Sequence, residues 1–233
     1  MVTDKKEKLL SDIGLEDGNF EIPIIYHQKI DLYNIEILGF HNTKYVDKDT
    51  GNKTVHFFIP DRKFDYIINN PERQVKKLLQ YRQVCLPDFS VFPEMSILQQ
   101  KMQIAKMYYC GACWQKHGIV VIPTATWSDK RSYDFCFNGI EKGAVVAVST
   151  LGTKKYFKEL FLAGFKELCK RKHPSHIICY CKPFDEMYSI AQSFNFDIIY
   201  VPDESNTKRK KSRQKLFPGQ LEFNLWENEK QIS

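Results

Sequence analysis

Three aspartates lie where short apolar runs give way to polar segments: Asp88, Asp129 and Asp134. Converging carboxylates can hold a divalent cation, and such a cation can activate water for phosphodiester chemistry. These aspartates are therefore the candidate catalytic residues, and a divalent metal ion is the cofactor that they could hold. Aspartates in such places also cap turns through hydrogen bonds to the backbone, which is the stronger alternative.

Small polar residues and an aromatic residue end two of the same runs. A loop that precedes a helix expected from Lys154 could bind a phosphate through its backbone N–H groups and hydroxyls. A tryptophan and a nearby arginine could stack on a nucleobase. The candidate ligand-binding residues are Ser149, Thr150, Gly152, Trp127 and Arg131. The loop carries neither the P-loop nor the dinucleotide fingerprint, so helix capping by the hydroxyls and core packing of the tryptophan remain open.

The apolar runs themselves predict the fold class. Residues 84–86, 119–122 and 145–148 are continuous, short and bounded by turn formers, as is typical of strands buried on both faces of a parallel sheet. Strand and helix patterns then alternate to residue 202, which indicates crossover helices. We predict an α/β fold with a mostly parallel sheet of about five core strands. Ligands of such sheets bind beyond the carboxyl ends of the strands, whether the sheet is open or curls toward a barrel.

The remaining segments complete the domain plan. Residues 1–18 form a polar lead, 19–202 a single α/β domain, and 203–233 a flexible tail. The domain begins with a β-rich extension, in which a hairpin is expected around 49–52 and which would act as a cap or an antiparallel edge. A helical segment at 65–81 is divided by Pro71, with Lys76 and Lys77 on its solvent side. A longer helix is expected over 96–116, ended by Gly118.

The composition indicates in which cellular compartment the protein is expected. Hydrophobic residues make up 43% of the chain, which is ordinary for a globular protein. An apolar leader and an uninterrupted apolar stretch long enough for a membrane span are both missing from the sequence, so we expect a cytoplasmic protein with no membrane partner. Seven cysteines fit a reducing compartment. The Cys110-x-x-Cys113 pair has no second such pair to complete a familiar zinc site, so structural thiols are expected.

The net charge of +6 is concentrated near the C-terminus. The segment after Pro202 is polar and charged and is predicted to be disordered. Its cations would bind the phosphates of DNA without reading the sequence. They are Lys208, Arg209, Lys210, Lys211, Arg213 and Lys215.

A short motif follows this basic run. It resembles the peptide by which bacterial replication and repair proteins bind the sliding clamp, with a glutamine that can hydrogen-bond and hydrophobic residues that can enter a groove. The sliding clamp or another replication protein is therefore a candidate partner. The residues that would bind it are Gln220, Leu221, Phe223 and Leu225. The phenylalanine departs from the commonest form of the motif, and a terminal element folded back on the core is the alternative.

Three segments together carry a resemblance to a known family: LPDFSVFPEM, GIVVIPTATWSDKRSYDFCFNGI and GAVVAVSTLG. They resemble the family called domain of unknown function 4417, found in bacteria, phages, plasmids and other mobile elements. The resemblance covers roughly residues 56–201 and implies a mobile-element role, but it supplies no catalytic residues. Relatives tend to have glycine where this chain has Cys181.

These observations leave three functional hypotheses. The first is a phage or mobile-element protein that acts at or beside DNA, in replication or host takeover, through a nucleic-acid-binding or host-protein-binding core and a clamp-binding-like tail. The second is a metal-dependent enzyme that acts on nucleic acid or a phosphorylated ligand at the strand ends. The third is an inhibitor that binds a host protein.

Overall fold

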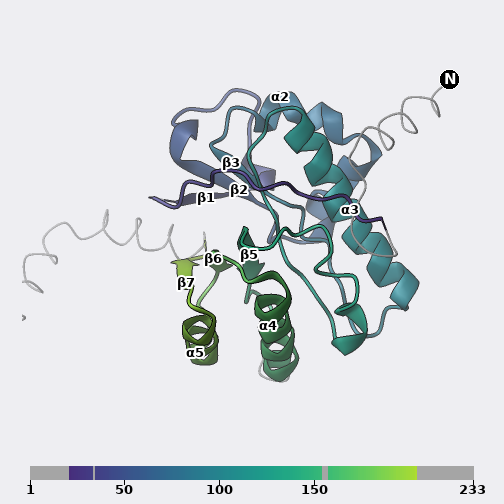
Figure 1. The fold of residues 1–233 in the computed structure, drawn as a ribbon. Coiled ribbons are helices and arrows are strands. Elements are labelled where there is room, and N and C mark those ends of the chain that lie inside the picture. Colours follow the sequence, from purple (N-terminus) through teal and green to yellow (C-terminus); the bar gives the residue numbers. More distant parts are fainter. Residues whose placement is uncertain (1–20, 34, 154–156, 204–233) are drawn as a thin grey trace, which may run out of the picture. The chain divides into compact units, whose positions relative to one another are not determined.

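A computed structural model describes residues 21–33, 35–153 and 157–203. Within these residues, parallel strands form a four-stranded sheet in the order β1-β2-β3-β4 and a three-stranded sheet in the order β5-β6-β7 (Figure 1). The strands are β1 (Glu36–Gly39), β2 (Lys53–His56), β3 (Gln83–Cys85), β4 (Val121–Ile122), β5 (Val145–Ser149), β6 (His176–Tyr180) and β7 (Asp197–Val201). The prediction of an α/β fold with parallel strands is confirmed.

The two sheets meet between β4 and β5. Thr124 bridges to Ala147 in parallel, the Ala125 N–H donates to the Ala147 carbonyl at 2.9 Å, and the Ala147 N–H donates to the Pro123 carbonyl at 2.8 Å. Because proline has no N–H, Pro123 limits regular pairing at this point. All the described strands therefore follow one another in chain order across this junction.

Side chains alternate between two hydrophobic clusters along these strands, as the period of two requires. In β5, Val146 and Val148 belong to the larger cluster, which includes the helices, whereas Val145 and Ala147 belong to the smaller one. Phe58, just after β2, stacks on Tyr180 of β6 inside the smaller cluster, with ring centroids 5.2 Å apart. Since three strands separate β2 from β6, the sheet must curl, and the smaller cluster fills the inside of a partial barrel.

Helices cover the outer face of this curled sheet. They are α2 (Val75–Leu78), α3 (Ile97–Lys116), α4 (Lys158–Lys172) and α5 (Asp185–Phe194). Figure 1 shows α4 and α5 beside each other next to β5–β7, and α2 and α3 near the other sheet. Short 3-10 turns complete the fold at Phe40–Asn42, Thr50–Asn52, Asp61–Lys63, Asp65–Asn69, Pro71–Gln74 and Lys130–Ser132. None of the helices in the described ranges is long and apolar enough to span a membrane.

Local sequence explains α3, the longest helix. Ser96 and Gln99 form a capping box, in which the serine hydroxyl accepts from the Gln99 N–H and the glutamine side chain accepts from the Ser96 N–H. Tyr108 and Trp114 are fully buried, and the Trp114 indole donates to the Pro71 carbonyl at 3.0 Å. The prediction of a helix over 96–116 is confirmed, since it differs from α3 only by the capping residue.

The predicted hairpin around 49–52 is wrong, and so is the antiparallel edge. Strands β1 and β2 are parallel, with Ile37 opposite Thr54, and they extend the sheet to more than the predicted five strands. The chain between them, residues 40–52, is long enough for a crossover, which a parallel pair requires. Asp49 does adopt the left-handed conformation of a turn residue, at φ 55°, but the turn it begins is a 3-10 turn.

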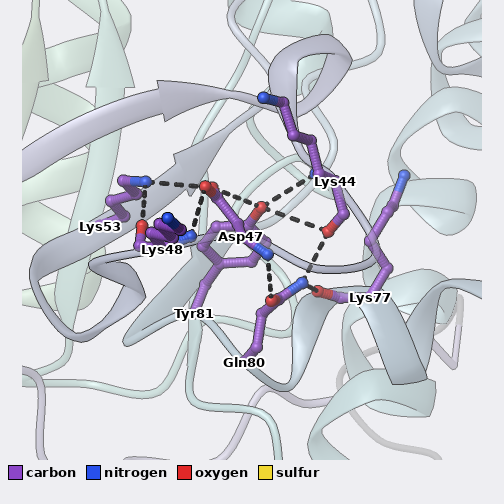
Figure 2. Close-up of polar contacts among 7 residues, drawn as sticks. All are labelled: Lys44, Asp47, Lys48, Lys53, Lys77, Gln80 and Tyr81. Carbon is purple, nitrogen blue, oxygen red and sulfur yellow. Dashed lines mark hydrogen bonds and ion pairs between the residues drawn. The ribbon is translucent and has the colours of Figure 1, made fainter.

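The β1–β2 crossover is fastened to the segment before β3 by the polar network in Figure 2. The Asp47 carboxylate accepts from Lys53 Nζ at 3.0 Å and from the Tyr81 hydroxyl at 3.1 Å, while the Gln80 amide donates to the Lys44 carbonyl at 2.6 Å. The Lys53 hydrogen bond holds the pKa of Asp47 below its ordinary value. These bonds join loops that are distant in sequence and so fix the edge of the sheet.

The prediction that Lys77 lies on the solvent side of its helix is wrong. Its side chain is buried, and its ammonium lies 4.0 Å from the centre of the Phe40 ring. Burial lowers the pKa of Lys77. An aromatic face attracts a cation, and the aliphatic stem fills apolar space, so a lysine here packs as part of the core. The predicted division at Pro71 is confirmed, because a new 3-10 turn begins there.

Candidate functional site

A cavity of about 420 Å³ lies at the carboxyl ends of β3, β4 and β5. The polar clusters that follow these strands contribute to its lining: Asp88 and Ser90 after β3, Thr126 and Ser128 after β4, and Ser149 and Gly152 at the end of β5. Its volume falls within the range of small-molecule sites, roughly 300–1,000 Å³. This is the edge of the sheet at which parallel α/β folds bind ligands.

The entrance of the cavity is apolar. Several of the large hydrophobic side chains that remain exposed gather here: Phe92, Leu151, Phe157 and Leu160. Between 37% and 52% of each residue is exposed. Exposed apolar groups gathered around one cavity are typical of a ligand or partner site, whereas single exposed hydrophobic residues are ordinary.

Trp127 forms one wall of the cavity. The centre of its ring lies 5.0 Å from the centre of the Phe161 ring and 5.9 Å from that of the Phe137 ring. Only 9% of the residue is exposed. Gly164 of α4 lies against the indole so closely that a Cβ there would be 2.1 Å from the tryptophan Nε1. Trp127 is thus a core residue that also forms part of the cavity wall, and stacking on a nucleobase stays a prediction.

Asp88 is one of the two carboxylates that line the cavity. It is half-buried, and no residue in the described ranges donates a hydrogen bond to it. Burial, and secondly the charge of Asp61, raises the pKa of Asp88 to about 7. The Asp61 carboxylate accepts from the Ser90 N–H at 3.1 Å and hydroxyl at 2.9 Å, so it is held by the cavity wall. Asp88 can therefore exchange a proton near neutral pH or accept hydrogen bonds from a ligand.

Two serine hydroxyls have defined roles in the cavity. Ser128 donates its hydroxyl proton to Gln100 Oε1 at 2.7 Å and so offers only lone pairs to a ligand. Ser149 Oγ accepts from the Leu151 N–H at 3.0 Å and keeps its own proton to donate. Gln100 is fully buried and donates to the Met95 carbonyl at 3.1 Å. Sequence reasoning missed Gln100, although a polar residue one turn before Ile104 on the buried face of α3 was a usable signal.

The other predicted aspartates lie elsewhere. Asp129 caps the 3-10 turn at Lys130–Ser132 and pairs with Arg131, whose guanidinium also donates to the Pro93 carbonyl. The hydrogen bond from Arg131 lowers the pKa of Asp129. Asp134 is exposed and lies 3.6 Å from Arg171. Neither aspartate lines the cavity, and the described residues contain no group of acidic, cysteine or histidine side chains able to hold a metal ion. The structure thus separates the three catalytic candidates.

The loop that was predicted to bind an anion, with Ser149, Thr150 and Gly152, contributes only some of these residues to the cavity. Gly152, at φ 76°, lines the cavity, but Thr150 turns inward and its hydroxyl donates to the Lys182 carbonyl at 3.0 Å. Helix α4 is described from Lys158, and its N-cap is Phe157. The expected start at Lys154 lies outside the described residues. Ser149 and Thr150 do not cap α4, because their hydroxyls bond within the strand-end loops.

The cysteines pack as the composition suggested. Cys110 and Cys113 are buried, and burial raises the pKa of both thiols. Cys179 belongs to the larger cluster, whereas Cys181, which follows the end of β6, packs against the smaller one. Cys181 has a φ of 68°, a conformation that favours glycine, which gives a backbone reason for the glycine expected in relatives. The basic run at 208–215 and the motif at 220–225 lie outside the described residues.

The charge on Asp88 should make the stability of the protein depend on pH. Its pKa is raised on folding, so the folded state binds more protons between about pH 4 and pH 7, and stability falls as the pH rises through this range. Asp88→Asn removes the charge. We expect the variant to gain roughly 1–2 kcal/mol over the wild type at pH 8, and little at pH 4. Urea unfolding at both pH values measures this; an equal difference at the two values would contradict it.

Fold and site together define a partial β/α barrel with a strand-end cavity. The chain belongs to the family described as a domain of unknown function, DUF4417, whose model matches residues 15–197. This confirms the resemblance found in the sequence.

Two phage proteins are similar to the chain. The Gene 1 protein of Mycobacterium phage L5 is 38% identical over 138 residues, which are 58% of this chain and 59% of the relative. The Gene 1 protein of Mycobacterium phage D29 is 38% identical over 128 residues, 54% of this chain and 47% of the relative. The chain thus matches about half the length of these curated relatives, and no solved structure matches it. The family therefore has phage members, as predicted.

Proposed function

We propose that this protein acts at or beside DNA in the cytoplasm of a phage-infected bacterium, and that its cavity receives one unstacked nucleobase. The observation that carries the proposal is that aromatic rings and hydrogen-bonding groups line one cavity. Phe92, Phe157 and Trp127 supply the rings, and Asp88 and Ser149 supply hydrogen-bonding groups in the same lining. Proteins that read unstacked bases combine these two features.

Size and energy both suit a base. A cavity of about 420 Å³ accommodates a bicyclic base with part of its sugar. Stacking a base on an aromatic side chain contributes about 1–3 kcal/mol and is available only when the base leaves its own stack. The relatives are phage proteins, which supports a role in a phage-infected cell. Among the described residues that line the cavity, none is a lysine or arginine, so phosphate contacts must come from elsewhere.

The C-terminal tail is the proposed source of those contacts. The six cations from Lys208 to Lys215 would bind DNA phosphates without reading the sequence. Gln220, Leu221, Phe223 and Leu225 would attach the protein to a sliding clamp or another replication protein. Both roles rest on the sequence. If a protein truncated after Pro202 still retains the clamp from a host lysate, the proposed role of the tail in clamp binding is contradicted.

Single-stranded DNA binding tests the proposal for the core. Phe157→Ala should weaken binding of a labelled oligonucleotide by about tenfold, since one stacking surface is removed. Tyr188→Ala is the matched control, because Tyr188 and Phe157 are both 46% exposed and Tyr188 lies outside the cavity. Fluorescence anisotropy measures both. Equal affinities of the two variants would show that the cavity does not take part in DNA binding.

The same assay separates the tail from the cavity. Truncation after Pro202 should reduce the slope of log affinity against log salt by about 4, since six cations on single-stranded DNA release their counterions with a slope of about 0.7 each. Phe157→Ala should leave that slope unchanged.

A second candidate function is acid–base catalysis by Asp88. It is favoured by one observation, a carboxyl group with a pKa of about 7 at the carboxyl end of a barrel-like strand. A general acid or base is most effective when its pKa is near the working pH. Turnover of a bound nucleic acid that is lost in Asp88→Asn, with binding kept, would establish this function in place of simple binding.

A further inference from the structure

The hydrogen-bonding groups of the cavity indicate which base it takes. We infer that the cavity selects guanine, with the Asp88 carboxylate accepting from the two N–H groups of the base edge and the Ser149 hydroxyl donating to its carbonyl oxygen. This inference rests on the proposed function, and it adds the identity of the base.

Asp88 supplies the acceptors. Its carboxylate lines the cavity and receives no hydrogen bond from any residue that the structure describes, so both oxygens are available to a ligand. Ser128 adds a further acceptor, because its only proton is donated to Gln100 Oε1. An ionised carboxylate can accept two parallel hydrogen bonds from a planar pair of donors. Acceptor groups of this kind in the lining favour a ligand that presents adjacent N–H groups.

Ser149 supplies a donor. Its oxygen already accepts from the Leu151 N–H at 3.0 Å, which leaves the hydroxyl proton to point elsewhere. Guanine presents a carbonyl oxygen beside two N–H donors on its Watson–Crick edge. Adenine and cytosine each present one amino donor beside an acceptor, and thymine presents a single N–H between two carbonyls. Guanine alone offers two adjacent N–H donors, one for each carboxylate oxygen, together with an acceptor for the hydroxyl.

An arginine side chain is the main competitor, since its guanidinium also offers paired donors. It offers no acceptor to Ser149, and it is far smaller than a bicyclic base. The four exposed apolar residues around the entrance would remain largely uncovered by it. A guanine base with its sugar is large enough to contact these residues as well, so the volume of the cavity favours the nucleotide.

Proton release provides a readout of the Asp88 contact. The groups that act on Asp88 or share its cavity are Asp61, Cys85 and Glu94, and all of them are neutral or anionic. In the free protein Asp88 is therefore partly protonated at neutral pH. The N–H groups of guanine bind only the ionised form, so affinity for guanine should rise with pH up to about pH 8, by at most about tenfold per pH unit.

Isothermal titration with four deoxynucleoside monophosphates at pH 6 and pH 8 tests this inference. All four carry the same phosphate, so their differences report the base. We expect deoxyguanosine monophosphate to bind about tenfold more tightly than the others at pH 8, and to lose that advantage at pH 6. Deoxyinosine monophosphate, which lacks the amino group of guanine, should bind about tenfold more weakly, the effect of one hydrogen bond to a charged group.

Asp88→Asn supplies the matched variant. It keeps the size of the side chain but replaces one acceptor with a donor, so guanine selectivity and its pH dependence should both disappear. Tighter binding of acetyl-arginine amide than of the guanine nucleotide would overturn the inference. Equal binding of all four nucleotides would also overturn it while leaving the proposed function in place. If neither the nucleotides nor single-stranded DNA bind, both the guanine inference and the proposed function are contradicted.

Discussion

Gly139→Ala should destabilise the protein by about 2–4 kcal/mol. Gly139 has a φ of 78°, where an alanine costs about 1 kcal/mol. A Cβ at this position would also lie 2.6 Å from the Pro23 carbonyl oxygen and 2.6 Å from the Tyr108 ring. Neither neighbour can move easily, because Tyr108 is fully buried and the Gly139 carbonyl accepts from the Ile25 N–H at 2.9 Å. Overpacking against fixed neighbours adds roughly 1–3 kcal/mol.

Gly143→Ala is the control for the backbone cost alone. Gly143 has a φ of 79°, and a Cβ there would have nothing within 4 Å. It should therefore lose only about 1 kcal/mol. Urea unfolding of both variants separates the two contributions. Equal losses would mean that Gly139 does not lie as close to Pro23 and Tyr108 as the structure describes.

Gly164→Ala should have the second large effect, and its sign is informative. In the middle of α4, alanine normally stabilises a helix by about 1 kcal/mol relative to glycine. Here the added methyl group would lie 2.1 Å from Trp127 Nε1 and 2.2 Å from its Cδ1. The indole must move, and the cavity wall moves with it. Overpacking at so short a distance should cost about 2–3 kcal/mol, so we expect a net loss of about 1–2 kcal/mol instead of a gain.

The displaced tryptophan should also be visible in binding. Because Trp127 lines the cavity, Gly164→Ala should weaken oligonucleotide binding at least tenfold in protein that remains folded. Urea unfolding gives the stability, near-UV circular dichroism reports the indole environment, and anisotropy gives the affinity. A stabilised variant with an unchanged tryptophan signal would show that α4 and Trp127 are not in close contact.

Much of the central fold could be predicted from the sequence because local signals there agree with one another. The capping residue Ser96, the apolar stripe and Gly118 all mark the same helix, and the run 145–148 is too apolar to face water on either side. Patterns of this kind depend on neighbours in the chain. They therefore carried over to the structure with small shifts, as at β5 and β6.

The N-terminal strands could not be predicted in the same way. Asp49 and Gly51 form a turn, as their types indicate, but whether β1 and β2 pair as a hairpin or in parallel depends on contacts with β3 and on the network around Asp47. Lys77 is a similar case, since only the tertiary structure places Phe40 beneath its ammonium. The curl of the sheet likewise follows from a contact between Phe58 and Tyr180, which are far apart in the chain.

The candidate site was partly predictable for the same reason. Strand-end positions placed Asp88, Trp127, Ser149 and Gly152 at one face, and all four line the cavity. Arg131 and Asp129 follow the same strand but turn toward each other, because a charge pair two residues apart satisfies itself locally. Sequence spacing cannot reveal that choice. Nor could it reveal the apolar rim, which brings Phe92 together with Phe157 from distant loops.

The indole signals of the tryptophans test the central claim most directly. In a Trp226→Phe variant, a nitrogen-15 spectrum contains one indole signal from Trp127 and one from Trp114, whose indole is buried and donates to the Pro71 carbonyl. Adding a short single-stranded oligonucleotide that contains guanine should shift the Trp127 signal and leave the Trp114 signal in place. Binding of the oligonucleotide with both signals unchanged would contradict the account, because the DNA would then bind away from the strand-end cavity.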